Sequence, residues 1–597
     1  MSGDDSAGEL AAKDAASGAA GPVAAAAAPG TMKWYGWGAE GQEFDPAGRP
    51  GVWSYAQAHL GITEHLPRNV PVAAERIALP DPVANAPFLR AVTEILGAAS
   101  CSQSAVDRLV HAYGKSTRDL WRMRHGQVTF APDCVLFPES EEQILRIIAA
   151  ASLHDVVIVP FGGGSNVAGC LEIPQRDGRM VATINLRRFN RVLGIDKVSG
   201  TARIQAGILG PDLERALAAE GLTLGHFPDS FPYSTLGGWI ATRSSGMLSD
   251  SYGNIEDMVL ALRMLAPSGL IETREVPHAS NGPDAKRLCF GSEGTLGIIT
   301  EVTLNVRRAP QKREFRGYLF PSFAAGIEAM RTCVHAGVAP ALSRLNDPDR
   351  TQLSAAFRRK TGWAETALGH AFKSYLRRVR RFDLAQGCLL IAAFEGDPDA
   401  IAWRRRRAEA VYQRNGGIGL GRSPGEAFAE GKFDFPHIRD FLMDYHVLAD
   451  VGETATVWSN MLPLYRAGVA AYREALGRGG RRHWVGCHIS HSYAAGASAY
   501  FTFAFACNRG PSGEVDPWAE LEHYSAAKRA GLDCFSKHGA TLSHHHAVGY
   551  EHLPWLAGES PMPGGSVVAA VKSTLDPTGI MNPGKLIPER SLARLAG

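Results

Sequence analysis

Three segments of this chain combine glycine with short hydroxyl side chains, at residues 160–168, 225–246 and 291–297. Glycine lets a backbone approach a ligand closely, and hydroxyls together with free N–H groups donate hydrogen bonds to phosphate oxygens or to a ribityl chain. The middle segment adds one carboxylate, Asp229. Three such loops in one part of the chain predict an extended, phosphate-bearing cofactor that several loops contact.

The first loop differs from the two best-known phosphate motifs. Gly164 and Gly169 have the spacing of a P-loop, but Cys170 and Leu171 stand where that motif has Lys and Ser or Thr. The G-x-G-x-x-G order of a Rossmann turn is also missing. For any single loop the alternative is an ordinary turn between a strand and a helix. The presence of three loops makes that alternative weaker.

Tyr500 and the run His544-His545-His546 could carry out acid–base chemistry. Imidazole titrates near neutrality. A phenol, with an unperturbed pKa of ~10, can act as a general acid and base if nearby cations lower that value. We therefore expect His545 and His546 to supply positive or hydrogen-bonding groups to Tyr500. The alternative for Tyr500 is a tyrosine in the core of a strand.

The three consecutive histidines could instead belong to a turn or to a metal site. Neighbouring side chains point in different directions, so all three cannot easily ligate one ion. His488 and His491 could complete such a site, but the chain has no H-E-x-x-H motif. We predict that no metal is bound.

The composition describes a globular chain with more than one domain. Its 597 residues exceed what one compact core holds, and a net charge of +2 gives no argument for a nucleic-acid partner. Nine cysteines without a C-x-x-C pair argue against a disulfide scaffold or a zinc ribbon. No uninterrupted apolar run approaches the length of a membrane-spanning helix.

The composition changes along the chain and predicts five regions. Residues 1–31 form an Ala-rich tail that cannot bury enough apolar surface to become ordered. Residues 32–129 read as an N-terminal helical region. An α+β domain follows at 130–310, then a second domain at 311–555 in which helices dominate and arginine is dense. The turn-rich segment 556–597 is expected to return to the first domain.

Hydrophobic patterning places the elements of both domains. Ser140 is expected to cap a helix in a capping box with Gln143, and a second helix is expected at 211–220. A hairpin is expected at 258–273. Further strands are expected at 132–138, 156–160, 180–186, 191–195, 202–206, 297–306, 388–394, 486–490 and 499–505.

Five motifs in order, within residues 160–164, 228–239, 244–246, 252–257 and 291–300, resemble the FAD-binding domain of the vanillyl-alcohol oxidase/p-cresol methylhydroxylase superfamily. The resemblance implies a two-subdomain FAD-binding domain plus an α/β cap domain for the substrate, with the pyrophosphate on the glycine loops and the isoalloxazine facing the cap. The residues that it places at the cofactor are Pro160, Gly162, Gly163, Gly164, Ser165, Asn166, Pro228, Asp229, Ser230, Ser234, Thr235, Gly237, Gly238, Thr242, Ser245, Gly246, Glu293, Gly294, Thr295, Gly297, Ile298 and Ile299.

Within that superfamily, segments 33–38, 343–347, 438–440, 500–505 and 541–549 resemble the alkyldihydroxyacetonephosphate synthases. These enzymes exchange the acyl chain of acyl-dihydroxyacetone phosphate for a fatty alcohol without net redox change. Their flavin N5 acts as an electrophile that holds the substrate carbon. The resemblance implies a non-covalent FAD.

The same resemblance assigns roles to the matching residues. It implies Tyr500 as the general acid and base, with His544, His545 and His546 beside it. Arg439 matches the arginine that binds the substrate phosphate, and Arg344 matches another arginine of the site. The sequence departs from the family at Thr502, where the synthases have an aromatic residue, and at Ser165-Asn166 in the glycine loop. These departures leave the fine substrate preference open.

The alternative function on the same fold is an FAD-dependent 2-hydroxy-acid dehydrogenase or oxidase acting on D-lactate or glycolate; residues 582–586 are shared widely across such enzymes and do not discriminate. We expect a homodimer and, given a long-chain substrate, peripheral contact with a membrane. The composition favours a bacterial cytoplasm. Eukaryotic members are peroxisomal, but the final Leu-Ala-Gly is no Ser-Lys-Leu type signal.

Overall fold

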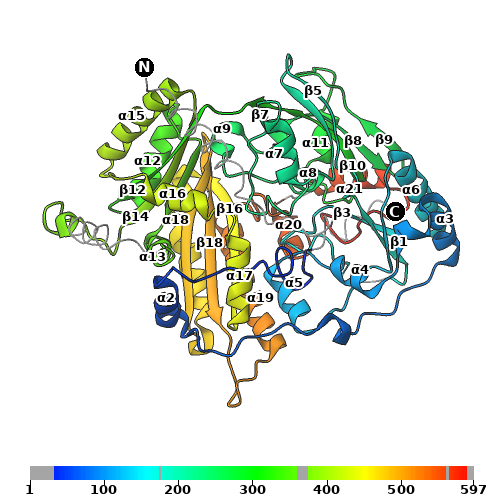
Figure 1. The fold of residues 1–597 in the computed structure, drawn as a ribbon, viewed down its shortest axis with the longest axis horizontal. Helices are drawn as coiled ribbons and strands as arrows, with labels where there is room; N and C mark the ends of the chain where they lie inside the picture. The colour runs from blue at the N-terminus through cyan, green and yellow to red at the C-terminus, as the bar shows by residue number, and fades with distance from the viewer. Residues whose placement is uncertain (1–31, 174–176, 360–373, 560–563, 588–597) are drawn as a thin grey trace, which may run out of the picture.

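The computed structural model describes residues 32–173, 177–359, 374–559 and 564–587. The expected Ala-rich tail at 1–31 lies outside these residues. The described chain forms two halves (Figure 1): two smaller sheets with their helices on the right, and one large sheet with its helices on the left. No helix within the described ranges is long and apolar enough to cross a membrane.

The right half contains the predicted strands of the first domain in two sheets. The four-stranded sheet has the order β1 (Cys101–Ser102), β2 (Cys134–Leu136), β4 (Val181–Asn185), β3 (Val157–Phe161), and β2, β4 and β3 run parallel. The antiparallel five-stranded sheet has the order β5 (Val192–Asp196), β6 (Thr201–Gln205), β10 (Ile298–Asn305), β8 (Val259–Ala266), β9 (Gly269–Glu272). The hairpin prediction is confirmed, since β8 pairs with β9.

The helices of this half also follow the sequence pattern. The expected helices are α6 (Glu141–His154) and α7 (Gly210–Ala218). Ser140 caps α6, because its side chain accepts the N–H of Gln143 at 3.2 Å. The capping box is wrong by one residue, since the Gln143 side chain accepts the N–H of Glu139 instead of that of Ser140. Helix α3 (Ala86–Leu96) packs on α6, and α8 (Leu236–Thr242) begins beside the second glycine loop.

The left half is built on an antiparallel seven-stranded sheet, and helices hold more of its described residues than strands do, as predicted. The sheet order is β15 (Ile418–Gly421), β12 (Lys312–Phe320), β14 (Cys388–Gly396), β13 (Leu342–Asn346), β17 (His483–Ser492), β18 (Gly496–Ala506), β16 (Val447–Val457). The sequence pattern predicted only β14, β17 and β18. In β12 and β16, charged residues and glycines interrupt the hydrophobic alternation that marks a half-buried strand.

Strand β18 shows how this sheet separates its core from a polar face. Phe501, Phe503 and Phe505 are fully buried in the cluster that includes residues of α18 (Trp458–Leu476) and α19 (Pro517–Lys537). Tyr500 and Thr502 alternate with them and therefore lie on the opposite face of the sheet. The remaining main helices of this half are α12 (Phe323–His335), α13 (Pro348–Ala356), α15 (Pro398–Arg414), α16 (Ser423–Glu430) and α17 (Phe435–Asp444).

The N-terminal and C-terminal segments of the described chain link the two halves. Helix α2 (Gly51–Leu60) contacts β17 at the lower left of Figure 1, while α3 lies at the far right, so the segment between them runs along both halves. After α4 (Ala105–Val110), α5 (Thr117–Arg124) contacts β16. Beyond α20 (Leu553–Glu559) and α21 (Gly564–Leu575), Met581 bridges to Ile158 in β3.

Candidate active site

One cavity is lined by the glycine loops of the right half and by side chains of the left half. We call loops 160–166, 228–238 and 292–297 the glycine wall. We call Arg344, Arg439, His488, Tyr500 and Thr502 the sheet wall, since four of them lie on strands of the seven-stranded sheet. The predicted cofactor residues that line this cavity are Pro160, Gly162, Gly163, Gly164, Ser165, Asn166, Pro228, Asp229, Ser230, Ser234, Thr235, Gly237, Gly238, Thr242, Glu293, Gly294, Gly297 and Ile299.

Four predicted cofactor residues do not line it. Ile298 faces the apolar core, and the Thr295 hydroxyl donates to the Ser292 carbonyl at 2.7 Å. Gly246 packs tightly against the backbone of residue 227. Ser245 donates to Asn254 at 2.6 Å and lines a smaller neighbouring cavity together with Arg344 and Tyr500. Their cofactor roles stay predictions.

Glycine is required where two loops of the glycine wall cross. A side chain at Gly163 would collide with the carbonyl oxygen of Tyr233, and one at Gly162 would collide with the Thr235 hydroxyl. This close crossing brings residues from distant parts of the sequence onto one surface. Thr235 also caps α8, because its hydroxyl accepts the N–H of Gly238 at 3.3 Å.

The glycine wall fits a pyrophosphate-bearing cofactor. Among the described residues, no acceptor binds the backbone N–H groups of residues 162–166, and the Ser165 hydroxyl also has no partner. Consecutive free N–H groups in a turn form a concave anion site. The Glu293 side chain, however, serves another part of the protein. Its carboxylate accepts the N–H groups of Val548 and Gly549, both at 2.8 Å.

Tyr500 lies at the centre of an aromatic cluster in the sheet wall. Its hydroxyl is 2.9 and 3.0 Å from the two ring nitrogens of His545 and 3.4 Å from His491 Nε2. His488 stacks on its ring with centroids 4.6 Å apart. His546 also lines the cavity, whereas His544 does not. The structure therefore brings Tyr500 together with His545 and His546.

Glu453 holds in place the loop that carries His544, His545 and His546. One oxygen of its carboxylate accepts the N–H groups of His544, His545 and His546 at 2.8–2.9 Å and the Ser543 hydroxyl at 2.7 Å. The other oxygen is buried without a hydrogen-bond partner within the described chain and lies 3.8 Å from His545 Nδ1. Glu453 lies on β16 directly opposite Tyr500 of β18. No sequence motif marks it, because its contacts are long-range.

The protonation states differ from the expected ones. Burial lowers the pKa of His544 and of His545 to about 4, so both imidazoles are neutral at pH 7. Burial, together with Glu453 and Asp229, raises the Tyr500 pKa well above its ordinary value. The expectation that cationic histidines lower this pKa is therefore wrong: the phenol is protonated and faces a neutral imidazole. Burial opposes ionisation of Glu453, yet the three histidines and the backbone N–H of His545 hold its pKa well below the usual range.

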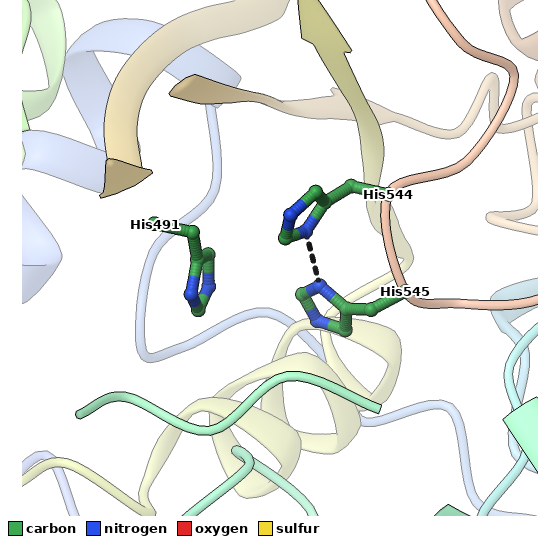
Figure 2. Close-up of side chains that lie close together, drawn as sticks. All are labelled: His491, His544 and His545. Atoms are coloured by element: carbon green, nitrogen blue, oxygen red, sulfur yellow. Dashed lines mark hydrogen bonds between the residues drawn. The ribbon is translucent and has the colours of Figure 1, made fainter. Parts of the chain in front are cut away.

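Three imidazoles of this site face one another (Figure 2). Ring nitrogens of His491, His544 and His545 all lie within 4.8 Å of each other, and His544 Nδ1 is 2.9 Å from His545 Nδ1. The outer nitrogens are held in place, His544 Nε2 by the Tyr493 hydroxyl at 2.6 Å and His491 Nδ1 by the Ser249 hydroxyl at 2.6 Å. Such donors could hold a transition metal. The prediction of a metal-free protein is untested.

Among the residues that the structure describes, three arginines line the cavity, and the sequence motifs identified two of them. Arg439 lies 3.4 Å from Asp450 and donates to the Lys115 carbonyl. Arg344 projects from β13 into both this cavity and the smaller one. The third is Arg350 on α13, whose guanidinium donates to the Thr502 hydroxyl at 2.6 Å. The sequence carries one signal for Arg350, the departure from the family pattern at Thr502, because a threonine at this position provides a hydrogen-bond acceptor for Arg350.

The comparisons with known proteins agree with this geometry. Residues 132–274 match the family described as FAD binding domain, and residues 309–586 match FAD linked oxidases, C-terminal domain. Alkyldihydroxyacetonephosphate synthase of Trypanosoma brucei brucei is 38% identical over 85% of this chain and 82% of its own. The protein of that name from Dictyostelium discoideum is 41% identical over 81% of this chain and 77% of its own.

Solved structures extend the likeness to three dimensions. An alkyldihydroxyacetonephosphate synthase superposes with a TM-score of 0.79 at 35% identity, over 93% of this chain and 98% of the other. p-Cresol methylhydroxylase superposes with a TM-score of 0.62 at 15% identity, over 85% of this chain and 98% of the other. The second likeness concerns the fold alone.

Proposed function

This chain belongs to the family of the alkyldihydroxyacetonephosphate synthases, and from that premise we propose that it exchanges the acyl chain of an acyl-dihydroxyacetone phosphate for a long-chain fatty alcohol, without net redox change. The observation that carries the proposal is the line of contacts from Tyr500 through His545 to Glu453, in the same cavity as the glycine wall. An exchange of this kind needs a proton removed beside a carbonyl and later returned.

The line of contacts suits this proton transfer. A proton taken from the substrate goes to the Tyr500 oxygen while the phenolic proton passes to a ring nitrogen of His545, 2.9 Å away. His545 is neutral beforehand and becomes an imidazolium. The carboxylate of Glu453, 3.8 Å from its Nδ1, stabilises that charge. The return of the proton follows the same path in reverse.

FAD, when bound, supplies the electrophile of the reaction, and the N–H groups of residues 162–166 would hold its pyrophosphate. We propose that it binds without a covalent link. Cys170 lines the cavity, but its thiol donates to Glu293 at 3.1 Å, and burial raises its pKa well above the ordinary value. A thiol in this state is a poor nucleophile. Acid precipitation should therefore release all the flavin into the supernatant.

We assign the substrate phosphate to Arg439. A guanidinium can bind a phosphate with two parallel hydrogen bonds. Arg439 lines the cavity, and its Nε is buried without a partner in the described chain. Nearby, Lys115 is buried and donates to the carbonyls of Lys33 and Trp34, which adds positive charge to this side.

Incorporation of a labelled alcohol tests the proposed function. The FAD-loaded protein is incubated with palmitoyl-dihydroxyacetone phosphate and labelled hexadecanol, and label is expected in alkyl-dihydroxyacetone phosphate. If no label enters, while D-lactate or glycolate bleaches the flavin anaerobically, the 2-hydroxy-acid dehydrogenase is correct instead. The homodimer and the membrane contact are separate proposals, to be tested by analytical ultracentrifugation and by co-sedimentation with anionic vesicles.

A further inference from the structure

Arg344, which is half-buried, and Arg350, which is buried, place two positive charges beside Tyr500. Arg350 is 7% exposed, and its guanidinium donates to Thr502, which lies two residues from Tyr500 on the same face of β18. Arg344 lines the same cavity and lies close enough to affect the ionisation of both Tyr500 and Arg350. Two neighbouring guanidiniums repel each other unless an anion lies near them.

The protein itself supplies little negative charge to this pair. Within the described residues, neither guanidinium has a carboxylate oxygen within 4.0 Å, and Thr502 is the acceptor found for Arg350. The acidic groups that act on the two guanidiniums are Asp229 and Asp347. Burial raises the pKa of Asp229, and burial raises that of Asp347 to about 7, which weakens both as counterions. Asp347 also uses its oxygens to accept the N–H groups of Arg350 and Cys487, both at 2.8 Å.

Arg439, unlike Arg344 and Arg350, has a carboxylate beside it. Its guanidinium lies 3.4 Å from Asp450, a carboxylate that also pairs with Lys528 at 3.2 Å. Arg439 therefore has a resident counterion, whereas no carboxylate of the described chain pairs with Arg344 or Arg350. Burial lowers the Arg350 pKa to about 9 and the neighbouring Arg344 adds to this shift, so a charged guanidinium without a counterion costs free energy here. A bound anion would remove that cost.

If the proposed function holds, on which this inference rests, the exchange brings two different anions into one cavity, a phosphate and a fatty carboxylate. The phosphate stays attached to the three-carbon unit. The carbon–oxygen bond to the acyl group breaks, and the fatty carboxylate leaves with the electron pair. The alcohol oxygen forms the new bond and gives up its proton, so an acyl ester and an alcohol yield an ether, a fatty carboxylate and one proton. The leaving carboxylate needs its own cationic site.

We propose that Arg350, held by Thr502 and assisted by Arg344, binds the carboxylate of the departing fatty acid, at a subsite separate from the phosphate subsite at Arg439. A planar guanidinium matches a carboxylate geometrically. Because the site stabilises negative charge on the leaving group, it also favours cleavage of the acyl bond.

Equilibrium binding to the FAD-loaded protein tests this subsite without relying on turnover. The probes are labelled palmitate, labelled hexadecanol and inorganic phosphate, and the variants are Arg350→Gln, Arg350→Lys and the matched control Arg439→Gln. Arg350→Gln should weaken palmitate binding at least tenfold and change phosphate and hexadecanol binding less than twofold. Arg350→Lys should restore part of the palmitate affinity, and Arg439→Gln should weaken phosphate alone.

Three other outcomes overturn the subsite. If Arg350→Gln weakens phosphate more than palmitate, the arginine pair holds the phosphate. If all three probes weaken together, Arg350 only maintains the cavity; if none changes, it has no ligand role. Palmitate binding that depends on Arg350 in a protein that forms no ether would contradict the proposed function and leave the carboxylate site intact. The flavin content of each variant shows whether it folds.

Discussion

The glycine wall and the sheet wall face one cavity but use different parts of the chain. The glycine wall offers backbone N–H groups from contiguous loops, whose conformation allows no side chain at Gly163. The sheet wall offers side chains from separate strands and one helix; Arg350 donates to its Thr502, and Glu453 holds the loop of His544–His546 beside it. A backbone surface suits a cofactor that related enzymes share. A side-chain surface can differ between relatives and so decides which reaction the cofactor serves.

The largest effect is expected from the sheet wall at Tyr500. Tyr500→Phe removes the hydroxyl that exchanges the proton with His545 and should lower turnover by about 10²- to 10⁴-fold. The FAD content should match the unsubstituted protein, because the glycine wall is untouched. Turnover is measured with labelled hexadecanol, and the flavin by absorbance. A fully active variant would remove Tyr500 from the mechanism.

Gly163→Ala should weaken FAD binding, because it changes the glycine wall. The added methyl group would collide with the carbonyl of Tyr233, and overpacking of this kind costs about 1–3 kcal/mol, so FAD should bind roughly tenfold to a hundredfold more weakly. Titration of the apoprotein with FAD measures this. Gly194→Ala is the matched control, since its site has open space, and its FAD affinity should be unchanged. Equal affinities of the two variants would contradict the account.

Glu453→Gln should disturb the loop of His544–His546 and leave FAD binding unchanged. An amide accepts the three histidine N–H groups more weakly than a carboxylate and cannot stabilise an imidazolium, so kcat should fall about tenfold to a hundredfold. FAD should stay bound. The control is Glu520→Gln, a buried carboxylate on α19 that pairs with Arg481. If both variants lose the same activity per folded molecule, Glu453 has only a structural role.

Thr502→Val tests how the sheet wall positions Arg350. Loss of one hydrogen bond, worth about 0.5–1.5 kcal/mol, should weaken palmitate binding roughly threefold to tenfold. Hexadecanol binding serves as the control, because the alcohol carries no charge. Unchanged palmitate binding would mean that Arg350 keeps its position without Thr502.

The smallest change is expected in the pH profile. Because the His545 pKa is lowered to about 4, its neutral form persists from pH 8 down to about pH 5 and is lost only as the pH falls through 4. The profile of kcat/KM should therefore have no acidic limb between pH 5.5 and 8 that depends on His545. An acidic limb near the ordinary histidine pKa of about 6.5 that disappears in His545→Asn would contradict neutral histidines.

The two walls also differ in how far the sequence predicts them. Gly162, Gly163 and Asp229 stand in local motifs, because a loop that binds pyrophosphate needs its residues in order along the chain. Glu453 and Arg350 act through contacts with residues 90 or more positions away, which no local pattern records. The β16 strand that carries Glu453 was missed for a related reason, since its polar residues face a buried site and obscure the alternation. The Tyr500 pKa was predicted in the wrong direction, because burial depends on the folded structure.

The measurement that tests the central claim most directly is a turnover experiment that follows three quantities at once: ether formed, fatty acid released and the oxidation state of the flavin. The account predicts one alkyl-dihydroxyacetone phosphate for each fatty acid released, with the flavin oxidised at the end and no dependence on an added electron acceptor. Fatty acid release without ether formation, or a flavin that stays reduced until an acceptor is added, would contradict it.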